Sequence, residues 1–231
     1  VSIGANNNLG GSSSIYFDGG ALLVTNGFST SRNVTMTGAG EIGVVSGQTF
    51  TETGTFSGTG GLTKSNSGTL VLSGTNTYSG GTTFAGGTLQ VAADSNLGSG
   101  DLTFNGGTLA LTSSALTAKN VSMAGAGTID VASFQNLTAT GVISGTGALT
   151  KTGAGTVELT GTNTYSGGTN MAGGTFSVGA DNNMGTGNLT FNGGSLNVSS
   201  GFTSAKNATL SSNGTIDVDS SQTLTLSGLV S

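Results

Sequence analysis

The chain lacks several residue types whose chemistry defines common classes of functional site. It contains no Cys, Pro, His or Trp. Without Cys it has neither a disulfide framework nor a thiolate metal site. Charge is also scarce, with 10 acidic and 5 basic residues and a formal net charge of −5. Because nucleic acids and anionic membranes attract basic patches, this composition argues against both as partners.

Long apolar runs and targeting patterns are missing as well. No run approaches the length of a membrane span, so we expect no membrane insertion by this segment. No signal-peptide pattern opens the chain, and both ends fall in mid-repeat, so we expect it to be an excerpt from a longer repeat array. We expect no cofactor and no metal.

What the chain has in quantity is Gly, Ser, Thr and Asn, arranged in an internal repeat. Residues 58–144 align with residues 145–231 without a gap, and residues 1–57 match the trailing part of one more copy. A repeat of this length indicates a stacked solenoid. We therefore expect residues 1–231 to form one continuous all-β rod, a right-handed single-stranded parallel β-helix of about ten or eleven coils.

A shorter pattern, Gly-x-apolar, recurs inside each copy. Most of its steps have one length, the short step, as from Gly40 to Gly60, but each complete copy also has one long step, as from Gly60 to Gly87. The short step suits one coil of a parallel β-helix, and the apolar residue points inward because side chains alternate along a strand. The pattern predicts a single stacked file, the core ladder: Leu22, Ile42, Leu62, Leu89, Leu109, Ile129, Leu149, Phe176, Leu196 and Ile216.

The two long steps are interpreted as long coils whose extra residues form a bulged turn. Each of these coils also carries a lysine, Lys64 or Lys151, at the next inward position. A buried, unpaired Lys is costly. We therefore expect the strand to end before each lysine and the ammonium group to reach solvent.

The most distinctive blocks read Asn-Thr-Tyr-Ser-Gly-Gly-Thr and lie in the long steps. Their candidate residues are Asn76, Tyr78, Asn163 and Tyr165. One interpretation is a contact surface with Tyr as an amphipathic anchor. The favoured interpretation is a packed corner, in which the ring covers the turn and Asn binds the backbone.

The sequence offers no catalytic candidate. Acid–base catalysis of hydrolysis needs two carboxyl groups brought together. Asp130 has Ala110 and Thr150 at the equivalent positions one coil away, so no acids stack there. We interpret Asp130 as a solvated surface charge.

Four motifs occur in the same order in residues 58–91 and 145–178. They are Gly-x-Gly-x-Leu-Thr-Lys, Gly-Thr-apolar-x-Leu, Asn-Thr-Tyr-Ser-Gly-Gly-Thr and Gly-Gly-Thr-apolar. In these motifs the chain resembles the passenger-associated transport repeat of bacterial autotransporters, the type V secreted proteins. The resemblance implies a right-handed parallel β-helical passenger on the surface of a Gram-negative bacterium. It also implies an outer-membrane translocator barrel in the same polypeptide and a role of the repeat in passenger secretion and folding.

Together these observations predict a structural, non-enzymatic stalk or scaffold segment of a secreted passenger. Two alternatives stay open. The first is an adhesion or self-association module that binds a host surface or a neighbouring cell. The second is a carbohydrate-active β-helix enzyme, which requires clustered acidic residues on one face of the solenoid.

Overall fold

A computed structural model describes residues 1–11 and 14–231. The contacts between Cα atoms divide the chain into two compact units, Val1–Ala110 (unit 1) and Leu111–Ser231 (unit 2). This division falls inside the first complete copy of the repeat, residues 58–144. In both units the strands pair in parallel and wind into a β-solenoid, with about 11 turns in the two units together. The predicted all-β solenoid is confirmed.

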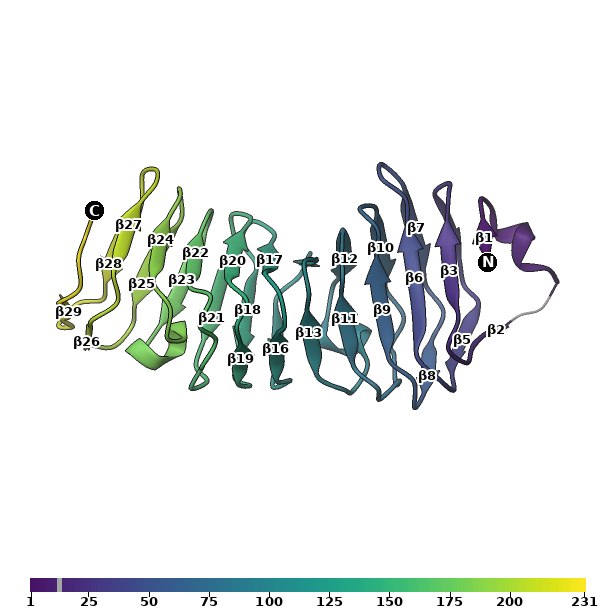
Figure 1. Cartoon of the computed structure of the whole chain (residues 1–231), viewed down its shortest axis with the longest axis horizontal. Coiled ribbons are helices and arrows are strands. Elements are labelled where there is room, and N and C mark those ends of the chain that lie inside the picture. Colours follow the sequence, from purple (N-terminus) through teal and green to yellow (C-terminus); the bar gives the residue numbers. More distant parts are fainter. Residues whose placement is uncertain (12–13) are drawn as a thin grey trace. The chain divides into compact units, whose positions relative to one another are not determined.

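Unit 1 is built from short strands and two short 3-10 helices, η1 (Asn6–Leu9) and η2 (Asp94–Leu97). Its strands are β1 (Ser2–Ile3), β2 (Ser14–Phe17), β3 (Ala21–Val24), β4 (Phe28–Thr30), β5 (Asn33–Met36), β6 (Gly40–Val44), β7 (Thr49–Glu52), β8 (Phe56–Gly58), β9 (Leu62–Ser65), β10 (Thr69–Leu72), β11 (Thr82–Phe84), β12 (Thr88–Val91) and β13 (Leu102–Phe104), with β14 (Thr108–Leu111) at the boundary. They form three parallel series: β1-β3-β6-β9-β11-β13, β4-β7-β10-β12 and β2-β5-β8. Figure 1 shows β3, β6 and β9 side by side. The coils of this unit therefore stack strand upon strand along three sides.

Unit 2 has the same construction and one 3-10 helix, η3 (Asp181–Met184). Its strands are β15 (Ala115–Thr117), β16 (Val121–Met123), β17 (Gly127–Val131), β18 (Asn136–Ala139), β19 (Ile143–Gly145), β20 (Leu149–Thr152), β21 (Thr156–Leu159), β22 (Thr169–Met171), β23 (Thr175–Val178), β24 (Leu189–Phe191), β25 (Ser195–Val198), β26 (Phe202–Ser204), β27 (Ala208–Leu210), β28 (Thr215–Val218) and β29 (Leu224–Leu226). The parallel series are β17-β20-β22-β24-β27, β15-β18-β21-β23-β25-β28, β16-β19 and β26-β29.

Apolar and polar residues alternate along the strands, which suits a strand with one face in the core and the other toward solvent. In β10, Leu70 and Leu72 point inward and are at most 1% exposed, whereas Val71 faces outward. Aromatic residues stack between coils in the same way, and the rings of Phe84 and Phe104 lie 4.4 Å apart, nearly parallel. Since side chains alternate between the two faces of a strand, only one set from each strand can reach the narrow core.

The sequence separation of facing residues measures the length of a coil. The separation from Thr69 to its partner Thr88 is typical of the shortest coils, and the separation from Gly40 to its partner Leu62 is typical of the longest. Among the register pairs within each described unit, none is as far apart in sequence as Gly60 and Gly87. A long step of the Gly-x-apolar pattern is therefore one coil plus one further side, and the expectation of a long coil with a bulged turn was wrong.

The predicted core ladder is accordingly spread over several sides. Nine of its ten residues are at most 4% exposed, whereas Ile216, in the last coils of unit 2, is 41% exposed. In unit 1, Leu62 lies on β9 and Leu89 on β12, which belong to different sheets. In unit 2, Leu149 pairs with Thr169, and Phe176 pairs with Val157 on another sheet.

The core ladder is also interrupted within a single sheet, where the longest coils change the pairing of its residues. Leu22 faces Ile42, but the next partner of Ile42 is Lys64, two positions beyond Leu62. Ile129 likewise faces Lys151. A shift of two positions leaves the side chain on the inner face of the strand. The residues of the core ladder therefore stay buried, although they no longer stack directly on one another. The ten residues do not form the single stack that the Gly-x-apolar pattern predicts.

Candidate functional site: the Asn-Thr-Tyr-Ser-Gly-Gly-Thr corners

The repeated block forms a corner of the coil in each unit. Residues 76–82 lead from β10 into β11 in unit 1, and residues 163–169 lead from β21 into β22 in unit 2. The conformation and the close packing of the backbone explain why the block contains glycines. Gly81 and Gly168 have φ angles of +84° and +88°, a region that Gly adopts without strain. A Cβ atom on Gly167 would collide with the backbone of the preceding coil.

The asparagine of each block bridges three successive coils. In unit 1, Asn76 Oδ1 accepts a hydrogen bond from the Phe56 N–H (2.8 Å), and its Nδ2 donates to the Asn96 carbonyl (2.6 Å). One partner lies in the preceding coil and the other in the next. Because Asn76 is 5% exposed, these bonds satisfy backbone groups that water does not reach.

The same bridge occurs in unit 2. Asn163 Oδ1 accepts from the Ile143 N–H (2.7 Å), and Asn163 Nδ2 donates to the Asn183 carbonyl (2.6 Å). Asn163 is 2% exposed. The amide supplies one acceptor and one donor at fixed separation, a combination that neither Asp nor Ser offers in the same shape.

The tyrosine of each block is fully buried. The Tyr78 hydroxyl lies 2.6 Å from Thr82 Oγ1, which donates to the Leu97 carbonyl. Since the single Thr82 hydroxyl proton goes to that carbonyl, the Tyr78 hydroxyl is the donor to Thr82. Burial raises the pKa of Tyr78 well above its usual value, which keeps the phenol protonated.

Unit 2 repeats this arrangement with Tyr165, Thr169 and the Met184 carbonyl. Burial raises the pKa of Tyr165 in the same direction. Because neither tyrosine is exposed, neither ring is available to a partner at the surface. The geometry corresponds to a packed corner and not to a contact surface.

A second asparagine, which is not among the candidate residues named from the sequence, completes each corner. Asn96 Oδ1 accepts from the N–H groups of Ala92 and Ala93, and its Nδ2 donates to the Gly74 carbonyl (2.9 Å). Asn183 makes the equivalent bonds in unit 2. The signal that identifies these residues is an Asn-x-Gly placed one coil after the Asn of the corner block.

The two lysines contradict the expectation that their ammonium groups reach solvent. Lys64 and Lys151 are 0% and 1% exposed. Lys64 Nζ donates to the carbonyls of Ser65 (2.6 Å), Asn66 (2.8 Å) and Gly86 (3.1 Å). An ammonium group has three donors, so the cage of carbonyls satisfies all of them.

Lys151 Nζ has an equivalent cage of the Thr152, Gly153 and Gly173 carbonyls. Burial lowers the pKa of both lysines to about 8, and the Asp130 carboxylate opposes this effect at Lys151. Each lysine thus joins carbonyls of two adjacent coils. The lysine of each repeat is therefore a structural element of the core.

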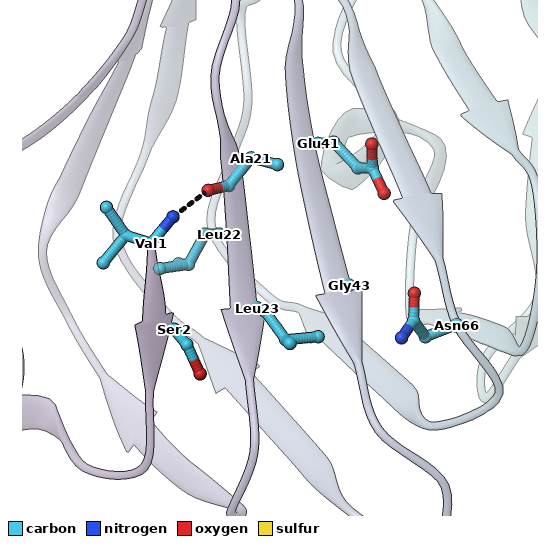
Figure 2. A pocket seen from close by; sticks show the side chains of 8 residues that line it. All are labelled: Val1, Ser2, Ala21, Leu22, Leu23, Glu41, Gly43 and Asn66. Atoms are coloured by element: carbon cyan, nitrogen blue, oxygen red, sulfur yellow. Dashed lines mark hydrogen bonds between the residues drawn. The ribbon is translucent and has the colours of Figure 1, made fainter.

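Shallow hollows lie on the outer surface of both units. One of about 410 Å³ in unit 2 lies beside the corner glycines and is lined by uncharged groups that include Thr150, Asn170 and Thr190. Figure 2 shows another, of about 310 Å³, on β1, β3 and β6 of unit 1. There the N-terminal ammonium group donates to the Ala21 carbonyl (2.8 Å), and Glu41 is the one acidic lining residue.

Within residues 1–11 and 14–231, no helix has both the length and the apolar character needed to cross a membrane. In the same part of the chain, no three side chains from His, Cys, Asp and Glu gather where they could hold a metal ion.

Both corners lie in segments that match a known protein family. The passenger-associated-transport-repeat family model matches residues 62–91 and 149–178. Neither a curated protein nor a solved structure matches the chain. Each matched segment runs from the strand that carries the caged lysine, through the corner, to the end of the second strand after it, β12 in unit 1 and β23 in unit 2. The chain thus matches the passenger-associated-transport repeat at two places, as the motifs predicted, which is consistent with an autotransporter passenger.

Proposed function

We propose that this chain is a stiff, non-enzymatic segment of an autotransporter passenger, displayed on the surface of a Gram-negative bacterium, in which the two repeats promote coil-by-coil folding. The family match and the parallel β-solenoid support a passenger stalk. The observation that carries the folding role is the bridging asparagine. Asn76 and Asn163 each hold the coil before and the coil after their own.

This arrangement suits a chain that emerges from a membrane from one end to the other. A solenoid propagates from neighbour to neighbour, because each coil buries its inner face on the last. Until both neighbouring coils have formed, the Asn76 side chain lacks either the Phe56 N–H or the Asn96 carbonyl. Each corner therefore becomes fully satisfied only when the coils on both sides are in place, which favours stepwise growth.

The proposal can be tested in the complete polypeptide with its own translocator, produced in a Gram-negative host. We expect Asn76→Ala together with Asn163→Ala to reduce the protease-resistant passenger on the cell surface severalfold. The matched control is Asn182→Ala, whose exposed amide makes only a 3.4 Å contact with the Thr162 hydroxyl. Display of the double variant at the control level would refute the folding role.

The adhesion alternative receives no support from the tyrosines, since both rings are buried. It predicts that the fragment alone binds cells or itself. Binding by the isolated chain with an affinity that survives loss of the corner asparagines would favour adhesion over the stalk role.

A further inference from the structure

Glu52 is a buried acidic residue at a position where the two complete copies of the repeat carry aliphatic side chains. It is the last residue of β7, points inward and is 1% exposed. Its partners in the adjacent coils are Thr30 on β4 and Leu72 on β10. The equivalent positions in the two complete copies of the repeat hold Ala139 and Leu226. Glu52 therefore places a carboxyl group where the repeat uses aliphatic side chains.

The carboxyl group is only half satisfied. Oε1 accepts a hydrogen bond from the Gly54 N–H (2.9 Å), whereas Oε2 is buried without a partner. An isolated buried carboxylate is strongly disfavoured relative to the neutral acid. Burial raises the pKa of Glu52 to about 7, although the N–H groups of Gly54 and Thr53 and the positive charge of Arg32 act in the opposite direction.

Arg32 is the charged side chain whose field reaches Glu52. Two of its nitrogens bind η1 and the turn that follows, since Nε donates to Asn6 Oδ1 (3.0 Å) and Nη2 donates to the Gly10 carbonyl (2.7 Å), whereas Nη1 is buried without a partner. The coil partners Thr30 and Leu72 carry no charge. The positive charge of Arg32 thus opposes part of the rise in the pKa of Glu52, although the two side chains do not form an ion pair.

We propose that Glu52 is a pH-sensitive element of unit 1, which packs the coil β6–β8 tightly when its carboxyl group is protonated and loosens that coil when the group ionises. The sign follows from proton linkage. Between pH 4.5 and 7 the folded coil holds a proton that the open coil releases, so opening becomes easier as the pH rises through this window. Above pH 7 the effect is complete. This inference does not depend on the proposed function.

Hydrogen exchange of the whole chain, followed by mass spectrometry and corrected for the intrinsic exchange rate, tests the proposal. In the wild type, protection of a peptide that covers residues 49–58 is expected to fall by at least about tenfold between pH 5 and pH 8, with about 70-fold as the limit that the shift in pKa sets over this interval. Peptides from β20 to β25 in unit 2 serve as the internal reference.

Three variants make the test specific. Glu52→Ala installs the residue found at position 139 and is expected to remove the pH dependence while raising protection at pH 8. Glu52→Gln keeps the shape without the charge and is expected to give the same flat profile. Glu158→Gln changes an outward carboxylate that binds the Thr138 hydroxyl in unit 2 and is expected to leave the wild-type slope intact.

Two results would overturn the proposal. The first is a wild-type profile at β7–β8 that does not change between pH 5 and pH 8. The second is a slope that persists in both Glu52 variants, since this would assign the pH dependence to another group.

Discussion

Replacement of Asn163 by Ala isolates the contribution of one corner to stability. The substitution removes the acceptor of the Ile143 N–H and the donor to the Asn183 carbonyl, and both groups lie in the buried corner. A buried backbone group left without a partner costs about 1–3 kcal/mol, so two such groups give an expected loss of about 2–6 kcal/mol in the free energy of unfolding. The loss is at the upper end of this range if water cannot enter the space left by the amide.

Urea unfolding followed by circular dichroism measures this loss. Asn182→Ala is the matched control, because it removes the same side chain from an exposed position in the next coil. Its expected effect is within about 0.5 kcal/mol of zero. If Asn163→Ala were no more destabilising than Asn182→Ala, the bridging role of the corner asparagine would be refuted.

Three further predictions address the lysine cages, a strained turn and the core. Because burial lowers the folded-state pKa of Lys64 and Lys151 from 10.5 to about 8, the unfolded chain binds more protons above pH 8. The free energy of unfolding, measured by urea titration, should therefore rise between pH 8 and 10. The double variant Lys64→Met/Lys151→Met should show no such rise. The same rise in the double variant would contradict this assignment. Phe134 is 99% exposed with a φ angle of +63°, where the equivalent residue of the preceding copy is Gly47 with +74°. Phe134→Gly should raise the free energy of unfolding by about 0.5–1 kcal/mol, and a decrease in urea titrations would rule out backbone strain at this turn. Leu109→Asp places a charge at a position that is 4% exposed and should cost more than about 3 kcal/mol, so a wild-type melting curve would show that Leu109 does not face inward.

The solenoid and its repeat were predictable from the sequence, since they follow from periodicity. Alternation of apolar and polar residues identified inward positions such as Leu62 and Leu149, and both are buried. The order of the motifs identified the repeat that the family model also matches. These features are local, and each repeats many times along the chain.

The side of the coil on which each Gly-x-apolar residue lies could not be predicted in the same way. A long step of the Gly-x-apolar pattern exceeds a coil by the length of one side, so it reads equally well as a long coil or as one coil plus a side. The structure separates the two, because Leu62 faces Thr82 and Leu89 faces Leu70 on another sheet. A regular motif period does not by itself give the period of the solenoid.

The burial of the two lysines was missed for a chemical reason. Lys64 reads as a surface residue because its partners are backbone carbonyls, which carry no sequence signal. Tyr78 can read as an interface residue because its hydroxyl partner, Thr82, resembles many other threonines in the chain. Such sites become visible only when the path of the backbone is known.

Disulfide formation between introduced cysteines tests the winding of the coils most directly, and the chain contributes no cysteine of its own. Thr63 and Thr83 face each other in adjacent parallel strands, one coil apart, with their side chains outside the core. Thr63→Cys/Thr83→Cys should therefore oxidise readily, whereas Thr63→Cys/Gln90→Cys, which spans a long step, should stay reduced because Gln90 lies on another sheet beside Val71. Efficient crosslinking of the pair that spans the long step, with none of the pair one coil apart, would contradict this winding.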